Sequence, residues 1–125
     1  MTINAFFDEQ YTNLGGVVTC HGRGTGAATS ALTAVKGPWT ITRSGVGTHS
    51  IVLNRKFSGL LNAQFAVIDG GTIDDWEVTL SSDLTTNKTI GIQVFKGGTA
   101  ADLPTTAKLL ITLVLQDTAA KPAGF

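Results

Sequence analysis

Short runs of alternating apolar and polar residues follow one another along most of this chain. The clearest pair flanks a glycine-containing turn at 44–47, where Trp39 and Ile41 share one face of the first run and Ile51 and Leu53 share one face of the second. A side-chain period of two is typical of a strand with one buried face. Two such runs joined by a short glycine-containing turn predict a β-hairpin whose large apolar residues point inward.

The same alternation predicts further strands, and the last of them has a distinct composition. In that run Leu109, Ile111, Leu113 and Leu115 share one face, and the second face is largely apolar as well. A strand of this kind is usually central, or is covered on its second face by another sheet or subunit. No segment of adequate length keeps a period of 3.6 residues, which excludes a helical fold. The predicted runs outside the hairpin are 17–21, 60–68, 75–80, 89–95 and 109–116.

The segments between these runs carry weaker signals. The glycine-rich stretch 22–26 is interpreted as a flexible loop, and 27–35 as strand or coil, with a helix as the alternative because of its alanines. The polar stretch 81–87 is predicted to be a turn, and 96–106 the longest loop. Strands about ten residues apart with turn residues between them are the pattern of an antiparallel sandwich.

The sequence therefore predicts an all-β fold, a single antiparallel β-sandwich or jelly-roll-like domain over 16–116. Residues 1–15 are predicted to form an N-terminal arm and 117–125 a C-terminal tail. The spacing of the apolar residues in the arm permits one or two helical turns. The apolar residues at the two ends are Phe6, Phe7, Tyr11, Leu14 and Phe125.

Composition points to an assembled protein rather than to one that acts alone. The chain has 125 residues, of which 42% are hydrophobic and only 14% are charged, about half the charged share of an ordinary soluble domain. Uncharged polar surface is easier to desolvate against a protein neighbour than charged surface. We therefore expect the domain to bind other protein subunits.

Several classes of function are not supported. Nine basic residues balance nine acidic ones and are scattered along the chain, whereas nucleic-acid binding depends on clustered cations. No apolar stretch has the length of a membrane span, and the first residues lack the pattern of a signal peptide. The single cysteine, Cys20, is interpreted as a small buried hydrophobe. We expect no nucleic-acid or membrane partner.

No constellation in the sequence supports catalysis or a cofactor. The two histidines, His21 and His49, lack the neighbours of a catalytic triad or a zinc site and are each interpreted as packed or rim residues. The acidic cluster Asp69, Asp74, Asp75 and Glu77 lacks the ligand spacing of a calcium loop. Trp39 and Trp76 are interpreted as core residues, with a sugar-stacking surface as the alternative. The chain is expected not to be an enzyme.

A family resemblance covers about residues 37–116. The hairpin Thr-Arg-Ser-Gly-Val-Gly-Thr at 42–48, the stretch Phe-Ser-Gly-Leu-Leu-Asn-Ala at 57–63 and the loop Gly-Thr-Ala-Ala-Asp-Leu-Pro at 98–104 resemble segments of small virion structural proteins of tailed bacteriophages. Within that group the chain is most similar to head decoration, or cement, proteins. Related sandwiches also occur in tail fibres and baseplates.

The resemblance implies a structural protein that is assembled in the bacterial host cytoplasm and lies on the outer surface of the phage head. It implies a homotrimer that binds adjacent major capsid subunits without a covalent step. Candidate contacts with the capsid or with another copy are Phe6, Phe7, Tyr11, Leu14, Val114 and Phe125. The alternative is a tail-fibre or baseplate component that binds a receptor or glycan, and an unrelated adhesion or carbohydrate-binding sandwich is a third reading.

Overall fold

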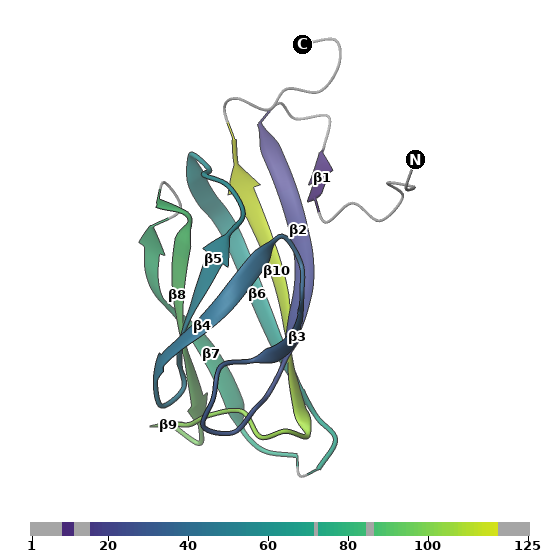
Figure 1. The fold of residues 1–125 in the computed structure, drawn as a ribbon, viewed down its shortest axis with the longest axis vertical. Helices are drawn as coiled ribbons and strands as arrows, with labels where there is room; N and C mark the ends of the chain where they lie inside the picture. Colours follow the sequence, from purple (N-terminus) through teal and green to yellow (C-terminus); the bar gives the residue numbers. More distant parts are fainter. Residues whose placement is uncertain (1–8, 12–15, 72, 85–86, 118–125) are drawn as a thin grey trace.

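The computed structural model describes residues 9–11, 16–71, 73–84 and 87–117, and these residues fold into β-strands packed as two sheets (Figure 1). Every ladder between neighbouring strands is antiparallel. The strands are β1 (Glu9–Tyr11), β2 (Val17–Thr25), β3 (Thr33–Lys36), β4 (Trp39–Gly45), β5 (Thr48–Leu53), β6 (Gly59–Asp69), β7 (Trp76–Leu84), β8 (Thr89–Lys96), β9 (Thr99–Ala100) and β10 (Ala107–Gln116).

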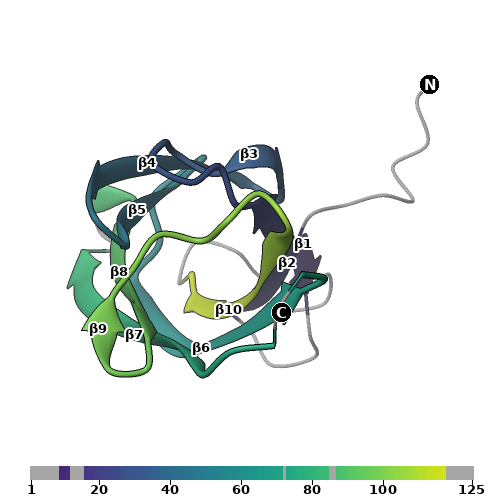
Figure 2. The same cartoon turned by 90° about the horizontal axis from the view of Figure 1, so that it is seen from below.

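The first sheet, called sheet A here, has the order β1-β2-β10-β6, with β3 also paired to β2. The second, sheet B, has the order β4-β5-β8-β7, with β9 also paired to β8. Seen from one end, the two sheets lie on opposite sides of the core and approach each other at both margins (Figure 2). At one margin β3 lies near β4, and at the other β6 lies near β7. We call these the β3–β4 seam and the β6–β7 seam.

The core lies between the sheets and is filled by alternate residues of the central strands. Strand β10 contributes its whole inner face, and β5 and β8 contribute theirs from the opposite sheet. Burial of this apolar surface is the main favourable term in folding, at about 25 cal/mol per Å². The buried apolar residues are Val18, Cys20, Leu32, Trp39, Ile41, Ile51, Leu53, Phe57, Ile90, Ile92, Val94, Leu103, Ala107, Leu109, Ile111, Leu113 and Leu115.

The predicted all-β sandwich is confirmed, and so are its clearest parts. Strands β4 and β5 form the predicted hairpin, with Trp39 opposite Leu53 and Ile41 opposite Ile51. The run with two apolar faces is β10, which lies between β2 and β6 in the middle of sheet A. Its inner face is fully buried, whereas its outer face mixes apolar and polar residues.

The glycine-rich stretch 22–26 was wrongly predicted to be a loop, because β2 continues through it to Thr25. A Cβ atom on Gly22 would lie 2.1 Å from the carbonyl oxygen of Lys36 and 2.4 Å from the Trp39 ring, and one on Gly24 would lie 2.9 Å from Leu32. The glycines therefore allow other parts of the chain to approach a strand closely, rather than serving to bend it.

Two other local predictions are wrong in part. The stretch 81–87 was predicted to be a turn, but β7 extends to Leu84, past a register shift between Leu80 and Ser82. The backbone N–H of Gly91 donates to Ser82 Oγ at 3.2 Å, so a serine side chain stabilises this irregular part of the ladder. Within the predicted long loop 96–106, Thr99–Ala100 forms the short strand β9 against β8.

Parts of the predicted arm and tail belong to the sandwich: residues 9–11 of the arm and Asp117 of the tail. Where the spacing permitted a helical turn, Glu9–Tyr11 forms β1 and pairs with β2, with Tyr11 opposite Val18. Asp117 is buried, donates its backbone N–H to the carbonyl of Gly16 at 2.6 Å and forms an ion pair with Arg55. Both contacts therefore lie at the end of sheet A where β2 begins and β10 ends.

Candidate functional site

Most of the predicted contact residues lie outside the described part of the chain. These are Phe6, Phe7, Leu14 and Phe125. Tyr11 occupies the last position of β1. Val114 lies half-buried on the outer face of sheet A, opposite Thr19 of β2 and Asn62 of β6. The register places Tyr11 and Val114 on strands separated by β2, so the structure does not bring them together as one contact.

The outer face of sheet A is mixed in character along β10. Leu110 and Val114 alternate with Lys108, Thr112 and Gln116. His21 Nδ1 lies 3.2 Å from the hydroxyl of Thr112, which places this histidine on the outer surface. His21 is therefore an exposed sheet residue with a hydroxyl partner.

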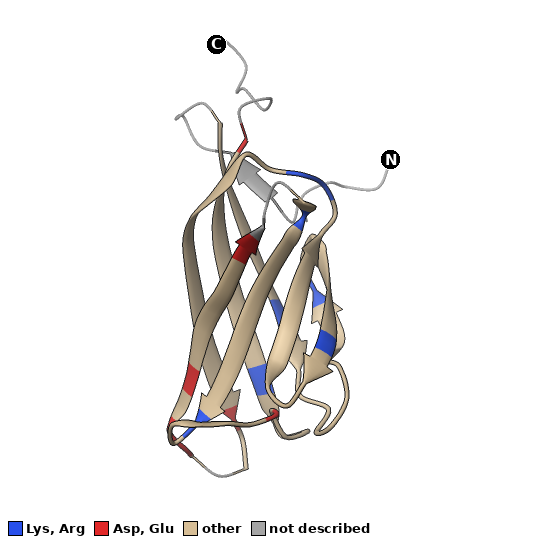
Figure 3. Ribbon diagram, turned by 90° about the vertical axis from the view of Figure 1, so that its left-hand side faces the viewer, with Lys and Arg blue, Asp and Glu red and all other residues tan. Residues whose placement is uncertain are grey.

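The outer face of sheet B is rich in hydroxyl and amide groups. Gln93 anchors it, because Thr48 Oγ1 donates to Gln93 Oε1 at 2.6 Å and Gln93 Nε2 donates to the carbonyl of Val46 at 3.1 Å. Figure 3 views this side, and most of the strand ribbon is free of charged residues. A surface of this kind has a low desolvation cost when a protein covers it. Its outward residues include Thr40, Thr42, Thr48, Ser50, Val52, Thr79, Thr89 and Gln93.

An Arg43–Asp102 pair holds the hairpin against the loop that follows β9. Arg43 Nε and Nη2 donate to the two carboxylate oxygens of Asp102 at 3.0 and 2.9 Å, and the Gly47 N–H donates to the same carboxylate at 2.9 Å. These hydrogen bonds hold the pKa of Asp102 below its ordinary value, and Arg43 makes the largest contribution. The bidentate geometry fixes the 101–106 loop to the turn of the hairpin.

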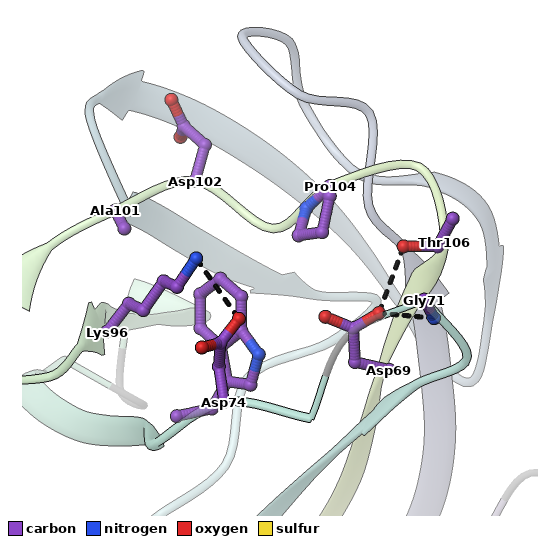
Figure 4. A pocket seen from close by; sticks show the side chains of 9 residues that line it. Asp69, Gly71, Asp74, Lys96, Ala101, Asp102, Pro104 and Thr106 are labelled. Atoms are coloured by element: carbon purple, nitrogen blue, oxygen red, sulfur yellow. Dashed lines mark hydrogen bonds and ion pairs between the residues drawn. The ribbon is translucent and has the colours of Figure 1, made fainter.

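A pocket of about 650 Å³ lies at one end of the sandwich (Figure 4). The ammonium group of Lys96 forms an ion pair with Asp74 at 3.1 Å and lies 5.7 Å from the centre of the Trp76 ring. Asp69 enters from the end of β6. The pocket therefore presents a half-buried aromatic side chain together with charged and hydroxyl groups. Its lining residues are Asp69, Gly71, Asp74, Trp76, Lys96, Ala101, Asp102, Pro104 and Thr106.

Asp69 stabilises the loop that forms one wall of this pocket. Its Oδ1 accepts hydrogen bonds from the Gly71 N–H and from the Thr106 hydroxyl, each at 2.9 Å (Figure 4). The Gly71 bond is the largest of the interactions that lower the pKa of Asp69. The described residues contain no group of three or more His, Cys, Asp or Glu side chains arranged to hold a metal ion. Asp69 accepts hydrogen bonds from Gly71 and Thr106, and Asp74 pairs with Lys96, so both carboxylates have partners within the protein.

The two tryptophans differ in their environments. Trp39 is 4% exposed and belongs to the core, as predicted, which is incompatible with a sugar-stacking surface. Trp76 is half-buried, packs against the core from β7 and lines the pocket. The buried Trp76 indole N–H forms no well-aligned hydrogen bond with a described residue, although its proximity contributes to the lowered pKa of Asp69. Only Trp76 remains available for stacking on a ligand.

His49 was predicted to be a rim or packed residue, and it is fully packed in the core at 1% exposure. Neither ring nitrogen has a hydrogen-bond partner among the described residues. Burial is the main cause of a lowered pKa for His49, opposed by the nearby charge of Asp102 and reinforced by that of Arg43. The imidazole is therefore neutral at neutral pH. Cys20 is also buried, as predicted.

Comparison of the chain with protein-family models, with curated proteins and with solved structures gives no match. In the described part of the chain, no helix has the length and apolar character needed to cross a membrane. Arguments about function therefore depend on the surfaces and the pocket themselves.

Sequence reasoning missed the features that depend on distant residues. Asp74 precedes β7 and Lys96 ends β8, and the Arg43–Asp102 pair joins the first hairpin to a much later loop. No local pattern links these residues. The available signal was limited to the turn composition at 69–72 and 97–98, which marks loops without showing that they meet.

Proposed function

We propose that this chain is a structural virion protein that decorates the outer surface of a tailed-bacteriophage head. In this role it binds adjacent major capsid subunits non-covalently, after assembly in the host cytoplasm. The observation that carries the proposal is the weakly charged outer surface of sheet B, whose hydroxyl and amide groups extend over several strands. The hairpin and loop segments that resemble decoration proteins lie in the same domain.

The mechanism is thermodynamic. A protein that binds the assembled capsid more tightly than its separate subunits shifts the equilibrium toward the assembled form. Many weakly bound copies together resist rupture, because loss of the shell requires many contacts to break. The sandwich supports this role because its large apolar residues pack between the sheets, which leaves the outer faces for contacts with other subunits.

Virion composition tests the proposal most directly. We expect quantitative mass spectrometry of purified particles to find this chain in copy numbers comparable with the major capsid protein. Particles that lack it are expected to release DNA at a lower temperature, and added purified protein should restore the original temperature. A few copies per particle, or unchanged heat resistance without the protein, would contradict the proposal.

Val114 tests whether the outer face of sheet A also contributes a capsid contact, in addition to the surface of sheet B. Val114→Asp places a charge on a half-buried apolar site, whereas Thr112→Asp, two residues away on the same face of β10, replaces a polar residue. We expect the first variant to bind protein-depleted particles more weakly than the second. Circular dichroism of both variants checks that the sandwich remains folded, and equal binding of two folded variants would exclude Val114 as a contact.

The pocket supports a second candidate, a tail-fibre or baseplate component that binds a glycan. A half-buried tryptophan beside carboxylate and hydroxyl groups is a chemistry that suits sugars. Glycan-array binding that is lost in Trp76→Ala but kept in Thr79→Ala, together with a low copy number per particle, would favour this candidate. Absence of glycan binding by the folded protein would reject it.

A further inference from the structure

Strand β6 is a long edge strand of sheet A that lies near β7 at the β6–β7 seam without pairing with it. Among the described strands it forms a ladder only with β10. None of its residues is buried, and Leu61 and Ile68 are 52% and 54% exposed. The backbone groups on the other side of such a strand are a template for a further strand. An edge strand of this length normally carries a feature that prevents pairing with another chain.

The other edge strands are protected from pairing by covering strands or by charged side chains, and β6 has less protection of either kind. The outer edge of β2 is occupied by β1 along Val18–Cys20 and by β3 near Arg23–Thr25. Strand β4 contains Arg43, and β7 contains Glu77 and Asp83. Strand β6 has no charged residue before Asp69, its last position, and no proline. Charged side chains and very short strands are the usual means of blocking an edge.

We propose that β6 is a self-association site, at which two copies of this chain pair their β6 strands antiparallel across a two-fold axis. Sheet A would then continue from one copy into the other. Pairing through the same strand in both copies makes the contact isologous, the geometry of the commonest protein dimers.

The register that fits best is centred on Gln64. Residues 62–66 follow a regular ladder with β10, whereas the register shifts opposite Val114 and Leu115. Centring on Gln64 keeps the new ladder within this regular part and away from the loop that leads to β7. It places Phe65 opposite Ala63 of the second copy on the inner face, a large side chain opposite a small one. On the outer face, the two Gln64 amides meet at the axis.

A second copy fits this edge better than a charged partner does. The edge from Gly59 to Ile68 carries no charge, and the whole chain has equal numbers of acidic and basic residues. Two copies therefore approach without net electrostatic repulsion, and a strongly charged strand would find no ion-pair partner along β6. The half-buried Phe65 and Val67 gain further burial when the sheet is extended.

A cysteine at the axis tests this arrangement in the full-length protein. Residues directly opposite each other in an antiparallel ladder have Cα atoms about 4.5 to 5.5 Å apart, within the range that a disulfide bridges. Under oxidising conditions we expect Gln64→Cys to form a covalent dimer on a non-reducing gel. Thr42→Cys, an exposed outward position on the edge strand at the other seam, is expected to remain monomeric on that gel. The native Cys20 is buried in both variants.

Analytical ultracentrifugation provides the second measurement. The native protein is expected to be a dimer, and Gln64→Lys to raise its dissociation constant roughly fivefold or more, because like charges directly opposite each other are destabilising. Thr42→Lys is the matched control and should leave the dissociation constant unchanged. Melting curves verify that both variants are folded.

Three results would overturn the inference: a monomeric native protein at the highest soluble concentration, a trimer, or an oligomer that Gln64→Lys does not weaken. A trimer would instead agree with the expectation drawn from the family resemblance. The test is independent of the decoration role, because it uses the isolated protein. A dimer that is absent from virions would disprove that role and leave the β6 contact intact.

Discussion

The two seams of the sandwich are built from different kinds of residues. At the β3–β4 seam, Trp39 is buried to 4% exposure, and glycines at 22 and 24 leave room for its ring and for Leu32. At the β6–β7 seam, the inward-facing Phe65 and Trp76 are only half-buried. The β3–β4 seam is thus closed by buried side chains of the chain itself, whereas side chains at the β6–β7 seam remain partly accessible to solvent.

This difference indicates a division of roles between the margins. Large side chains buried without voids contribute most to stability, so the β3–β4 seam is expected to contribute more to the free energy of unfolding than the β6–β7 seam. Half-buried apolar side chains beside a free strand edge contribute less to the isolated domain and gain more from a partner. Pairs of variants, with one substitution at each seam, measure how much each seam contributes to the free energy of unfolding.

Removing the tryptophan from each seam is expected to give the largest contrast. Trp39→Ala should lower the free energy of unfolding by about 3–5 kcal/mol, since it leaves a large cavity. Trp76→Ala should cost less, roughly 1.5 kcal/mol, because that side chain is only partly buried. Urea unfolding followed by circular dichroism measures both values. Similar costs for the two variants would show that the β6–β7 seam is as well packed as the other.

Adding a methyl group to each seam gives a smaller contrast. In Gly22→Ala the new Cβ would lie 2.1 Å from a backbone oxygen and 2.4 Å from the Trp39 ring, and overpacking of this kind costs about 1–3 kcal/mol. In Gly59→Ala the nearest atom is Gln116 Oε1 at 3.7 Å, an ordinary contact. Gly59→Ala is expected to be close to neutral in the same unfolding assay. A neutral Gly22→Ala would mean that the β3–β4 seam relaxes readily.

Mild acid should weaken the part of the core that contains His49. Since burial lowers the folded-state pKa of His49 below its ordinary 6.5, the unfolded chain binds the proton first. The free energy of unfolding therefore falls as pH drops below 6.5, by at most about 1.4 kcal/mol per pH unit for one proton. Arg43 and Asp102 are the charged groups near the ring, and neither is expected to titrate between pH 7 and 5.

Urea unfolding at several pH values tests this expectation, with His49→Leu as the comparison. The variant should show a flatter pH dependence between 7 and 5 than the native protein. An unchanged slope in His49→Leu would assign the acid sensitivity to other groups.

The smallest expected effect is at the loop beside the β6–β7 seam. Asp69→Asn weakens the bonds from Gly71 and Thr106, so amide exchange at Gly71 should accelerate while the melting temperature changes little. In the native protein the same loosening should occur only in stronger acid, as pH falls below the ordinary 3.8 toward the lowered pKa of Asp69. A large fall in melting temperature for Asp69→Asn would show that this loop supports the core.

The sequence predicted the parts of the fold that depend on local alternation. The hairpin around Gly45 and the central position of β10 followed from which residues share a face. The path of β2 through its glycines could not be predicted, because the reason for Gly22 is a tryptophan seventeen positions later in the chain. A glycine needed for close packing and a glycine needed for a turn look identical until the partner is known.

The candidate sites show the same limit. The weakly charged surface was predictable from the 14% of charged residues, but its location on sheet B depends on strand pairing. The pocket at Trp76 required Asp69, Lys96 and Thr106 to meet from three separate segments. The open edge at β6 is a property of strand order, which alternation alone does not specify.

The placement of β10 has a consequence for biosynthesis. Strands β2 and β6 share no ladder with each other and receive their common neighbour only when residues 107–116 have left the ribosome. Most of sheet B is encoded earlier, between residues 39 and 100, and its hairpin can form during translation. A chain that ended before Ala107 would leave β2 and β6 each with an additional unpaired edge, and unpaired strand edges favour aggregation.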